Sequence, residues 1–234
     1  MNKGKIYLIP TILGEGTEKS TLTYPILKAI KEIDVFIVEN LRTARRNIKR
    51  IHKEKNIDNT IFYSYGKHDK LDLATDLLPH ILSGQDIGIL SDAGLPCIAD
   101  PGSKIVDYAH QFQIDVLPLV GPSSIILALM ASGLNGQNFA FNGYLPIEKS
   151  ERIKKIRQLE SLSKKTNQTQ IFMETPYRNN QLIDSLLKTC SKNTRLCIAS
   201  DITLPTENIK TKTISEWQQT KKNIHKKPAI FLIG

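Results

Sequence analysis

Apolar runs rich in β-branched residues recur through the first half of the chain, separated by longer mixed stretches. The runs cover residues 5–10, 34–39, 60–64, 86–91 and 114–118. Most of the intervening stretches are long enough to hold a helix, and this β-α-β rhythm is typical of a parallel sheet covered by helices. The pattern predicts an α/β domain over residues 1–118.

The first mixed stretch predicts a helix that begins near Ser20 and carries Pro25 in its first turn. Its apolar residues fall on one face, which is expected to cover the sheet. They are Leu22, Ile26, Leu27, Ile30 and Ile33.

A second helix is predicted over residues 41–55, with basic and apolar side chains on opposite sides. The basic stripe comprises Arg42, Arg45, Arg46, Lys49 and Lys53, and the apolar side comprises Leu41, Ala44, Ile48 and Ile51. The sequence leaves open whether this stripe contacts phosphate groups or is only a solvated helix face.

The second half of the chain continues with alternating helices and strands. Helices are predicted over residues 121–134, 148–162, 177–189 and 215–223, and strands over residues 138–145, 169–173, 195–199 and 229–233. The segment 138–145 reads equally as an extended arm. These elements predict a second α/β domain over residues 119–234.

The composition is that of a globular protein of 234 residues, with 40% hydrophobic and 24% charged residues. Three cysteines without a C-x-x-C spacing argue against a disulfide framework and a zinc knuckle, and favour a cytoplasmic protein with reduced thiols. The apolar run near the start is short and interrupted by Pro10, so a first strand is favoured over a signal peptide. No run approaches the length of a membrane span.

The net charge of +9 is distributed unevenly. Residues 1–118 carry 15 basic and 15 acidic residues, whereas residues 119–234 carry 17 basic and 8 acidic ones. This excess is compatible with a polyanionic partner such as RNA and equally with a solvated surface.

The segment after the fourth apolar run is the strongest candidate for chemistry. It reads LSDAGLPCIADPG over residues 90–102, with two acidic residues, two glycines and two prolines. In open α/β sheets, ligands bind outside the carboxyl ends of the strands, where this turn is predicted to lie. A tight surface turn is the alternative explanation.

Two other predicted strands end in a carboxylate followed by an arginine. Glu39 and Arg42 follow the second run, and Glu174 and Arg178 follow the run at residues 169–173. Their positions allow them to face a ligand at the strand ends. The local sequence equally allows Glu39 to cap the next helix and Arg42 to be a surface charge.

Several classes of site are not supported by the sequence. The segment GEGTEKST over residues 14–21 lacks the glycines of a Walker A loop. Five dispersed histidines show no metal-ligand spacing, so no metal site is expected, and no G-x-S-x-G elbow is present.

In order along the chain, a series of segments resembles the ribosomal small-subunit RNA (cytidine-2′-O)-methyltransferase I family of the tetrapyrrole methylases. These segments are IYLIPTILGEGT, DVFIVENLR, LSDAGLPCIADPG, LPLVGPSSIILALMASGL, FNGYLP, IFMETPYR, ASDITLPTE and KKPAIFLI. The resemblance covers nearly the whole chain. It implies two α/β domains with S-adenosyl-L-methionine in the cleft between them, and a homodimer.

The resemblance also implies roles for individual residues. Cofactor contacts are expected at Leu13, Ser91, Asp92, Ala93, Gly94, Leu95, Ser123, Ser124, Met173, Cys197 and Ala229. A methyl group on a sulfonium is already activated, so the enzyme must mainly align an acceptor oxygen and remove its proton. Glu39 is the first candidate for the base, with Arg42 as its partner. Asp92 and Asp100 are the next candidates, and Glu174 and Arg178 are expected to contact the substrate.

The chain departs from the family pattern on the expected acceptor side. Where the family has E-D-T-R, this chain has Glu39-Asn40-Leu41-Arg42. Where the family has R-E-L-T-K, it has Ser200-Asp201-Ile202-Thr203-Leu204, and where the family has K-G-E near the end, it has Lys226-Lys227-Pro228. The chain is also shorter than typical members and is expected to lack a C-terminal extension, as in a divergent paralogue. The leading hypothesis is 2′-O-methylation of ribosomal RNA. A porphyrinoid C-methyltransferase and a cofactor- or RNA-binding paralogue without turnover are the alternatives.

Overall fold

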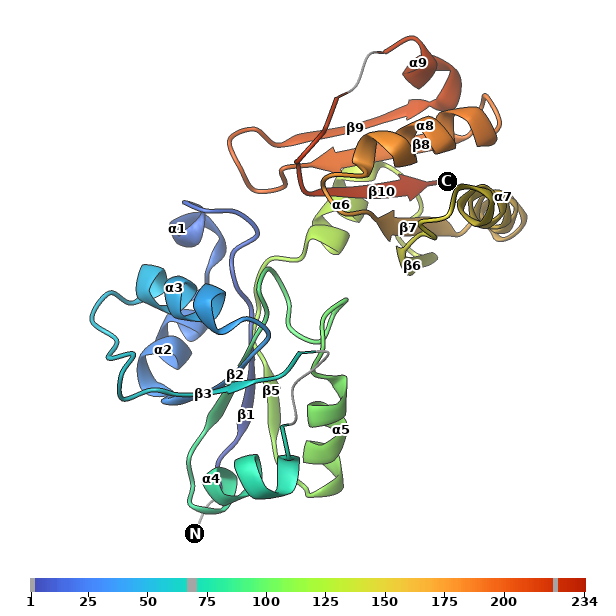
Figure 1. Cartoon of the computed structure of the whole chain (residues 1–234). Coiled ribbons are helices and arrows are strands. Elements are labelled where there is room, and N and C mark those ends of the chain that lie inside the picture. Colours follow the sequence, from blue (N-terminus) through green and yellow to red (C-terminus); the bar gives the residue numbers. More distant parts are fainter. Residues whose placement is uncertain (1–2, 67–70, 221–222) are drawn as a thin grey trace. The chain divides into compact units, whose positions relative to one another are not determined.

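The computed structural model describes residues 3–66, 71–220 and 223–234. Its backbone contacts divide the chain into two compact units, residues 1–123 and 124–234 (Figure 1). The division falls at the start of a helix, whereas the sequence places it after residue 118, at the end of a strand.

The first unit is built on a parallel sheet of five strands in the order β3-β2-β4-β1-β5. The strands are β1 (Ile6–Ile9), β2 (Val35–Val38), β3 (Ile61–Ser64), β4 (Ile87–Leu90) and β5 (Val116–Pro118). Each lies within an apolar run of the sequence. β2 and β4 are buried at every position because helices cover both faces of a parallel sheet.

The helices of this unit form two layers. They are α1 (Glu18–Thr21), α2 (Tyr24–Glu32), α3 (Leu41–Ile51), the π-helical turn η1 (Leu73–Leu77), α4 (Leu78–Leu82) and α5 (Ser103–Gln111). Residues of α2 and α3 pack with Phe36 and Val38 on one face of the sheet. Residues of α4 and α5 pack with Val35 and Ile37 on the other face. Successive residues of β2 therefore serve opposite cores, as the two-residue period of a strand requires.

The predicted first helix is broken into α1 and α2. Pro25 has no amide hydrogen, so a helix continuing from Ser20 would lose a backbone hydrogen bond there. The structure instead starts α2 at Tyr24 and places the proline in its first turn, where no such bond is needed. Ile26 and Ile30 are buried as predicted, whereas Leu27 is exposed.

β4 occupies a switch point in this sheet. The chain leaves β1 and β2 toward α2 and α3 on one face, and it leaves β4 toward α5 on the other. β4 lies between β1 and β2 in the sheet. The chain segments that leave its two neighbours therefore run to one face, and the segment that leaves β4 itself runs to the other. Such points are where open α/β sheets bind ligands.

The second unit contains a mixed sheet of five strands in the order β6-β7-β10-β8-β9. Its elements are α6 (Ser124–Ser132), β6 (Phe139–Tyr144), α7 (Lys149–Thr166), β7 (Thr169–Met173), α8 (Asn179–Thr189), β8 (Arg195–Ser200), β9 (Asn208–Thr213), α9 (Ile214–Gln218) and β10 (Ala229–Ile233). β6 and β7 are parallel, and the other neighbouring pairs are antiparallel.

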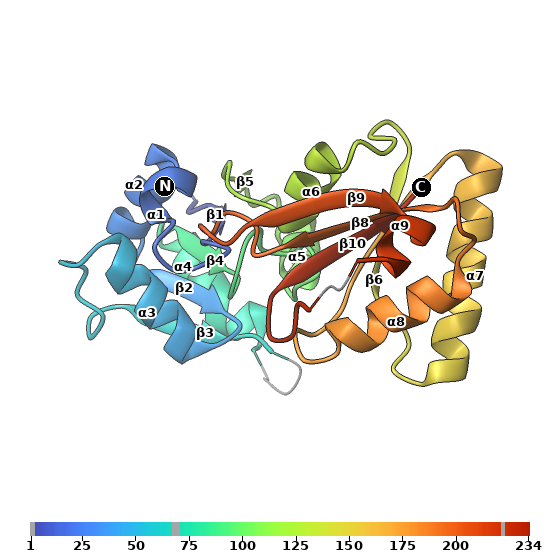
Figure 2. The same cartoon turned by 90° about the horizontal axis from the view of Figure 1, so that it is seen from above.

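Helices cover both faces of the second sheet. Residues of α7, α8 and α9 pack with Phe172, Ile198 and Phe231 on one face. The helix α6 contacts β8, β9 and β10 on the other, and Figure 2 shows α6 and α8 on opposite sides of these strands. Each unit therefore encloses a core of its own.

Candidate functional site in the first unit

The turn after β4 is held in place by the carbonyl group of Gly94. Its oxygen accepts hydrogen bonds from the Thr11 backbone amide at 2.9 Å and from the Ser91 hydroxyl at 2.9 Å. The Thr11 hydroxyl donates to the Ser91 carbonyl oxygen at 3.2 Å. The loops that follow β1 and β4 are thereby joined at the switch point.

Gly94 is also the residue that this turn requires sterically. Its φ of +76° lies in the left-handed region, and a Cβ at this position would lie 3.1 Å from Leu13 Cδ2. Of the predicted cofactor contacts, the structure therefore brings together Leu13, Ser91 and Gly94. Ala93 is exposed beside them, and Leu95 is half-buried.

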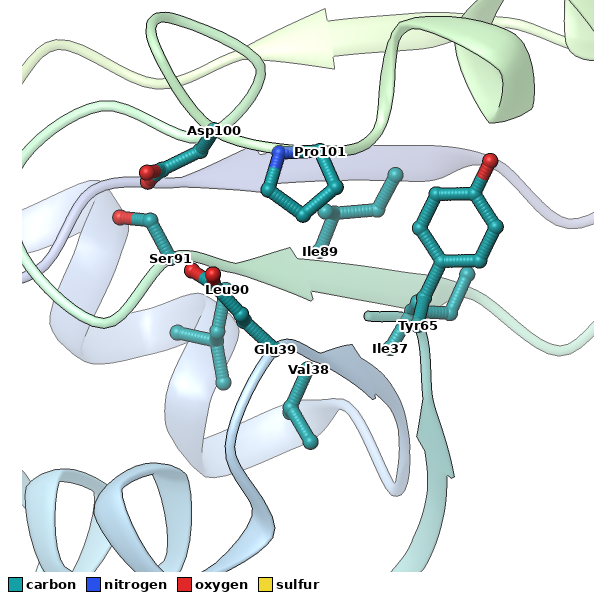
Figure 3. A pocket seen from close by; sticks show the side chains of 9 residues that line it. All are labelled: Ile37, Val38, Glu39, Tyr65, Ile89, Leu90, Ser91, Asp100 and Pro101. Atoms are coloured by element: carbon teal, nitrogen blue, oxygen red, sulfur yellow. The ribbon is translucent and has the colours of Figure 1, made fainter. Parts of the chain in front are cut away.

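A small pocket lies on the other side of β4, at the carboxyl ends of β2, β3 and β4 (Figure 3). It is lined by Ile37, Val38, Glu39, Tyr65, Ile89, Leu90, Ser91, Asp100 and Pro101. Figure 3 shows the carboxylates of Glu39 and Asp100 and the hydroxyl of Ser91 gathered on one side, with Tyr65 opposite them. The pocket is partly open, and its volume of about 10 Å³ is room for one water-sized group.

Three carboxylates influence one another around this pocket. Burial, together with the negative charges of Glu39 and Asp92, raises the pKa of Asp100 to about 6. Burial also raises the pKa of Asp92, although a hydrogen bond from the Asn40 backbone and the charge of Arg46 oppose the shift. A carboxyl group with a pKa near 6 is suited to proton transfer close to neutral pH.

Asn40 explains one departure from the family pattern. It is the N-cap of α3, where its side-chain oxygen accepts a hydrogen bond from the Thr43 amide at 3.0 Å. Asparagine and aspartate are about equally good at this position. Asn40, and not Glu39, therefore caps the helix, and Glu39 lines the pocket. Arg42 is exposed in the first turn of α3 and does not line it.

Two residues of this site were not singled out by the sequence. Tyr65 directly follows β3 and lines the pocket, so the strand-end rule applied to Glu39 would have identified it. Thr11 follows β1 and holds the Gly94 carbonyl group, a long-range contact that no local pattern indicates.

The candidate residues of the second unit gather mainly at one end of its sheet. Met173 is the last residue of β7 and pairs with Ile230, and Ala229 pairs with Ser200 at the end of β8. Cys197 pairs with Leu232, three residue pairs farther along, and is completely buried. The structure therefore separates Cys197 from Met173 and Ala229. Ser123, the last residue of the first unit, and Ser124, the first residue of α6, are both half-buried.

Glu174 and Arg178 form an ion pair in the turn after β7. Glu174 Oε1 accepts hydrogen bonds from Arg178 Nη2 at 2.6 Å, from Arg178 Nε at 3.0 Å and from the Thr175 amide at 2.7 Å. Because the Glu174 side chain is only 1% exposed, the pair holds the shape of this turn.

Two further departures from the family pattern contact each other. Lys227 donates a hydrogen bond to the carboxylate of Asp201. The same carboxylate accepts one from the Thr206 hydroxyl at 2.9 Å. The loops before β10 and after β8 are joined by this pair.

Within the described ranges, no three histidine, cysteine, aspartate or glutamate side chains are arranged to hold a metal ion. His68 lies outside the described residues. None of the described helices is both long and apolar enough to cross a membrane.

Residues 11–218 match the sequence model of the family Tetrapyrrole (Corrin/Porphyrin) Methylases. The chain belongs to this family. A Buchnera aphidicola (subsp. Acyrthosiphon pisum) protein named Ribosomal RNA small subunit methyltransferase I is 31% identical over 233 residues, covering 98% of this chain and 78% of that protein. A Halalkalibacterium halodurans protein of the same name is 31% identical, with 92% and 70% covered. The family and these names confirm the predicted methyltransferase class.

The fold of the chain also resembles that of a solved methyltransferase. The crystal structure of the methyltransferase CobJ matches with a TM-score of 0.64 at 15% identity, covering 99% of this chain and 94% of that one. This likeness confirms the predicted α/β fold class.

Proposed function

We propose that this methyltransferase uses S-adenosyl-L-methionine to methylate a ribose 2′-hydroxyl group in small-subunit ribosomal RNA. The observation that carries the proposal is the 31% identity, over 98% of the chain, to a protein named Ribosomal RNA small subunit methyltransferase I. The net charge of +9 supports a polyanionic substrate. The proposal includes a homodimer and a cytoplasmic location.

The turn after β4 fits a role in holding the cofactor. The missing side chain of Gly94 leaves space beside Leu13 that a Cβ would fill. The exposed Ala93 and the half-buried Leu95 lie on either side of Gly94 in the chain. When bound, S-adenosyl-L-methionine supplies a methyl group that its positive sulfur already activates. Ser91 holds the turn, and Asp92 is proposed to contact the cofactor.

The pocket beside β4 is proposed to receive the acceptor hydroxyl group. Its size suits one such group, and the carboxylates of Glu39 and Asp100 lie on its wall. We assign Glu39 as the acceptor of the hydroxyl proton and Arg42 as a contact to the neighbouring phosphate. Asp100 shares this wall, and the charge of Glu39 helps to raise the pKa of Asp100.

The proposal retains most of the other roles implied by the family resemblance. Met173, Ala229 and Ser124 of the second unit are proposed to contact the cofactor, as is Ser123 at the end of the first unit. Cys197 is completely buried, so in the proposal it supports the sheet and does not contact the cofactor. The ion pair of Glu174 and Arg178 is proposed to position the substrate.

The decisive assay incubates the protein with methyl-labelled cofactor and two acceptor pools, ribosomal RNA and porphyrinoid pigments. We expect label in small-subunit RNA, at one ribose identified by mapping. Label in a pigment would instead support a porphyrinoid methyltransferase. Cofactor binding without transfer to either pool would contradict the proposed reaction.

A Glu39→Gln variant tests the base. Removing the proton acceptor should slow transfer by about 10²-fold or more and leave cofactor affinity unchanged. Glu54→Gln, which alters an exposed carboxylate after α3, is the matched control and should transfer at the unaltered rate. A Glu39→Gln rate equal to that of Glu54→Gln would exclude Glu39 as the base.

A further inference from the structure

One face of α3 and of the turn after it carries only positive charge. Arg42, Arg45, Arg46, Lys49 and Lys53 are all exposed, and we call them the α3 basic face. The sequence predicted Lys53 within the helix, but α3 ends at Ile51 and Lys53 lies in the following turn. Residues 41–53 contain no aspartate or glutamate.

This arrangement is unfavourable for an isolated helix. Like charges three and four residues apart repel each other, and Arg42 places a cation in the first turn, where the helix dipole favours an anion. The stability of α3 therefore comes from elsewhere, namely from the buried Ala44 and Ile48 and from the Asn40 cap. A solvated face would need no such concentration of one sign.

Within the described parts of the chain, no ion pair joins the α3 basic face to a carboxylate, although the charge of Arg46 acts on Asp92. Among the described residues, the ion pair on α3 joins Arg50, outside the basic face, to Glu15 at 2.8 Å. Lys49 Nζ donates to the Lys53 carbonyl oxygen at 3.0 Å, which neutralises neither charge. The guanidinium of Arg45 lies 5.3 Å from the centre of the Phe62 ring. Stacking of this kind holds an arginine in place while its N–H groups stay available for phosphate oxygens.

The basic face begins at the candidate site. The Asn40 backbone amide donates to Asp92, and the charge of Arg46 acts on the same carboxylate. Glu39, directly before the Asn40 cap, lines the pocket. From Arg42 the face extends about 10 Å to Lys49 and then continues to Lys53.

We propose that the α3 basic face is the track that holds the phosphates of the RNA strand carrying the methyl acceptor. A row of cations over several turns matches a polyanion with regularly spaced phosphates, whereas one small anion would need only two or three of them. The track runs from the acceptor pocket, so it would fix the strand on one side of the reacting nucleotide. This inference rests on the proposed function.

The test compares two triple variants of the full-length protein. Arg45→Gln/Lys49→Gln/Lys53→Gln removes three charges of the track. It leaves in place Arg42, in the first turn of α3, and Arg46, whose charge acts on Asp92. Lys28→Gln/Lys31→Gln/Lys104→Gln is the matched control, because it removes three exposed charges from α2 and α5. Thermal unfolding and cofactor titration of both variants establish that each is folded and binds S-adenosyl-L-methionine.

Affinity for a small-subunit ribosomal RNA fragment is then measured from low to high salt. The track variant should bind the RNA at least about tenfold more weakly than the unaltered protein. Its plot of log K against log salt concentration should be less steep by about 2, which is about 0.7 for each of the lost phosphate contacts. The control should keep the affinity and slope of the unaltered protein.

The outcomes separate the track from the proposed function. An unchanged slope in the track variant, an equal loss in the control, or the absence of RNA binding by the unaltered protein would overturn the track. Selective loss of RNA affinity without any methyl transfer to RNA would support the track and contradict the proposed reaction. Methyl transfer to RNA by the unaltered protein, together with an unchanged salt slope in the track variant, would support the proposed reaction but not the track.

Discussion

At the scale of single residues, the site depends on backbone groups as much as on side chains. The carbonyl oxygen of Gly94 accepts from both Thr11 and Ser91 and so joins two loops that are about eighty residues apart in the chain. The glycine is needed because its φ is positive and because Leu13 lies against it. A substitution there therefore changes the backbone and the proposed cofactor wall together.

A Gly94→Ala variant should lose about 1–2 kcal/mol of folding free energy from the left-handed backbone. The added Cβ, 3.1 Å from Leu13, should also weaken S-adenosyl-L-methionine binding by tenfold or more, as measured by calorimetry. Gly16→Ala is a matched control, since Gly16 has a φ of +84° with no atom near its Cβ position. It should lose similar stability and keep its affinity. Equal affinities in the two variants would remove Gly94 from the cofactor wall.

Asp100 gives a prediction on pH. Burial and the charges of Glu39 and Asp92 raise its pKa from 3.8 to about 6. In this range the folded protein binds more protons than the unfolded one, so the stability contributed by Asp100 is complete below pH 3.8 and is lost as the pH rises through about 6. In Glu39→Gln the repulsion is smaller, and the carboxyl carbon resonance of Asp100 should titrate at a lower pH. An unchanged midpoint would show that the two carboxylates do not interact.

At the scale of helices and strands, buried polar contacts fix where elements end. Lys55 is 6% exposed, and its ammonium group donates to the carbonyl oxygens of Lys31 and Ile33 and to Asp34 Oδ1. These acceptors lie at the end of α2 and the start of β2. The single lysine therefore joins the chain after α3 to the connection between α2 and β2.

Replacing Lys55 by methionine should lower the free energy of unfolding by about 2 kcal/mol, because buried carbonyl groups lose their donor. Lys53→Met changes an exposed lysine two residues earlier and should change stability by less than about 0.5 kcal/mol. Urea unfolding of the two variants measures the difference. Equal midpoints would mean that the buried lysine contributes no net stability.

The strand β9, which the sequence missed, shows why some elements escape recognition. β9 has isoleucine and threonines alternating with Lys210 and Lys212, a two-residue period over a half-buried edge strand. Such a strand carries little apolar signal, since only one neighbour and one face support it. The alternation alone was available to identify it, whereas the apolar run of β10 and the buried strand β7, with its apolar end Ile171–Met173, were recognised in full.

At the scale of the whole molecule, each unit has its own core and its own polar contacts. In the second unit, Glu160 Oε1 accepts hydrogen bonds from the Thr194 hydroxyl, from the Ser191 amide at 2.8 Å and from Lys164 at 3.0 Å. Burial raises the pKa of Glu160, but the hydrogen bonds from Thr194, Ser191 and Lys164 outweigh it and leave the pKa below 4.5. Its stabilising effect is thus present above pH 4.5 and is lost as the pH falls through the lowered value.

Glu160→Gln should therefore reduce amide protection near neutral pH within residues 124–234, and the reduction should fade in acid. Lys55→Met should reduce protection within residues 1–123 instead. Hydrogen exchange resolved along the chain distinguishes the two. Loss of protection spread equally over both units by either variant would show that the units unfold together.

The sequence by itself determined the strands of the first sheet, most helices, the methyltransferase family and the acidic turn after β4. These depend on local periodicity, on the limits that proline imposes and on motifs that are contiguous in the chain. Only the tertiary structure decided that β4 lies between β1 and β2, and that Glu39 and Asp100 therefore line one pocket. Strand order and burial are set by long-range packing, and the pKa of a carboxyl group depends on which charges that packing brings near it.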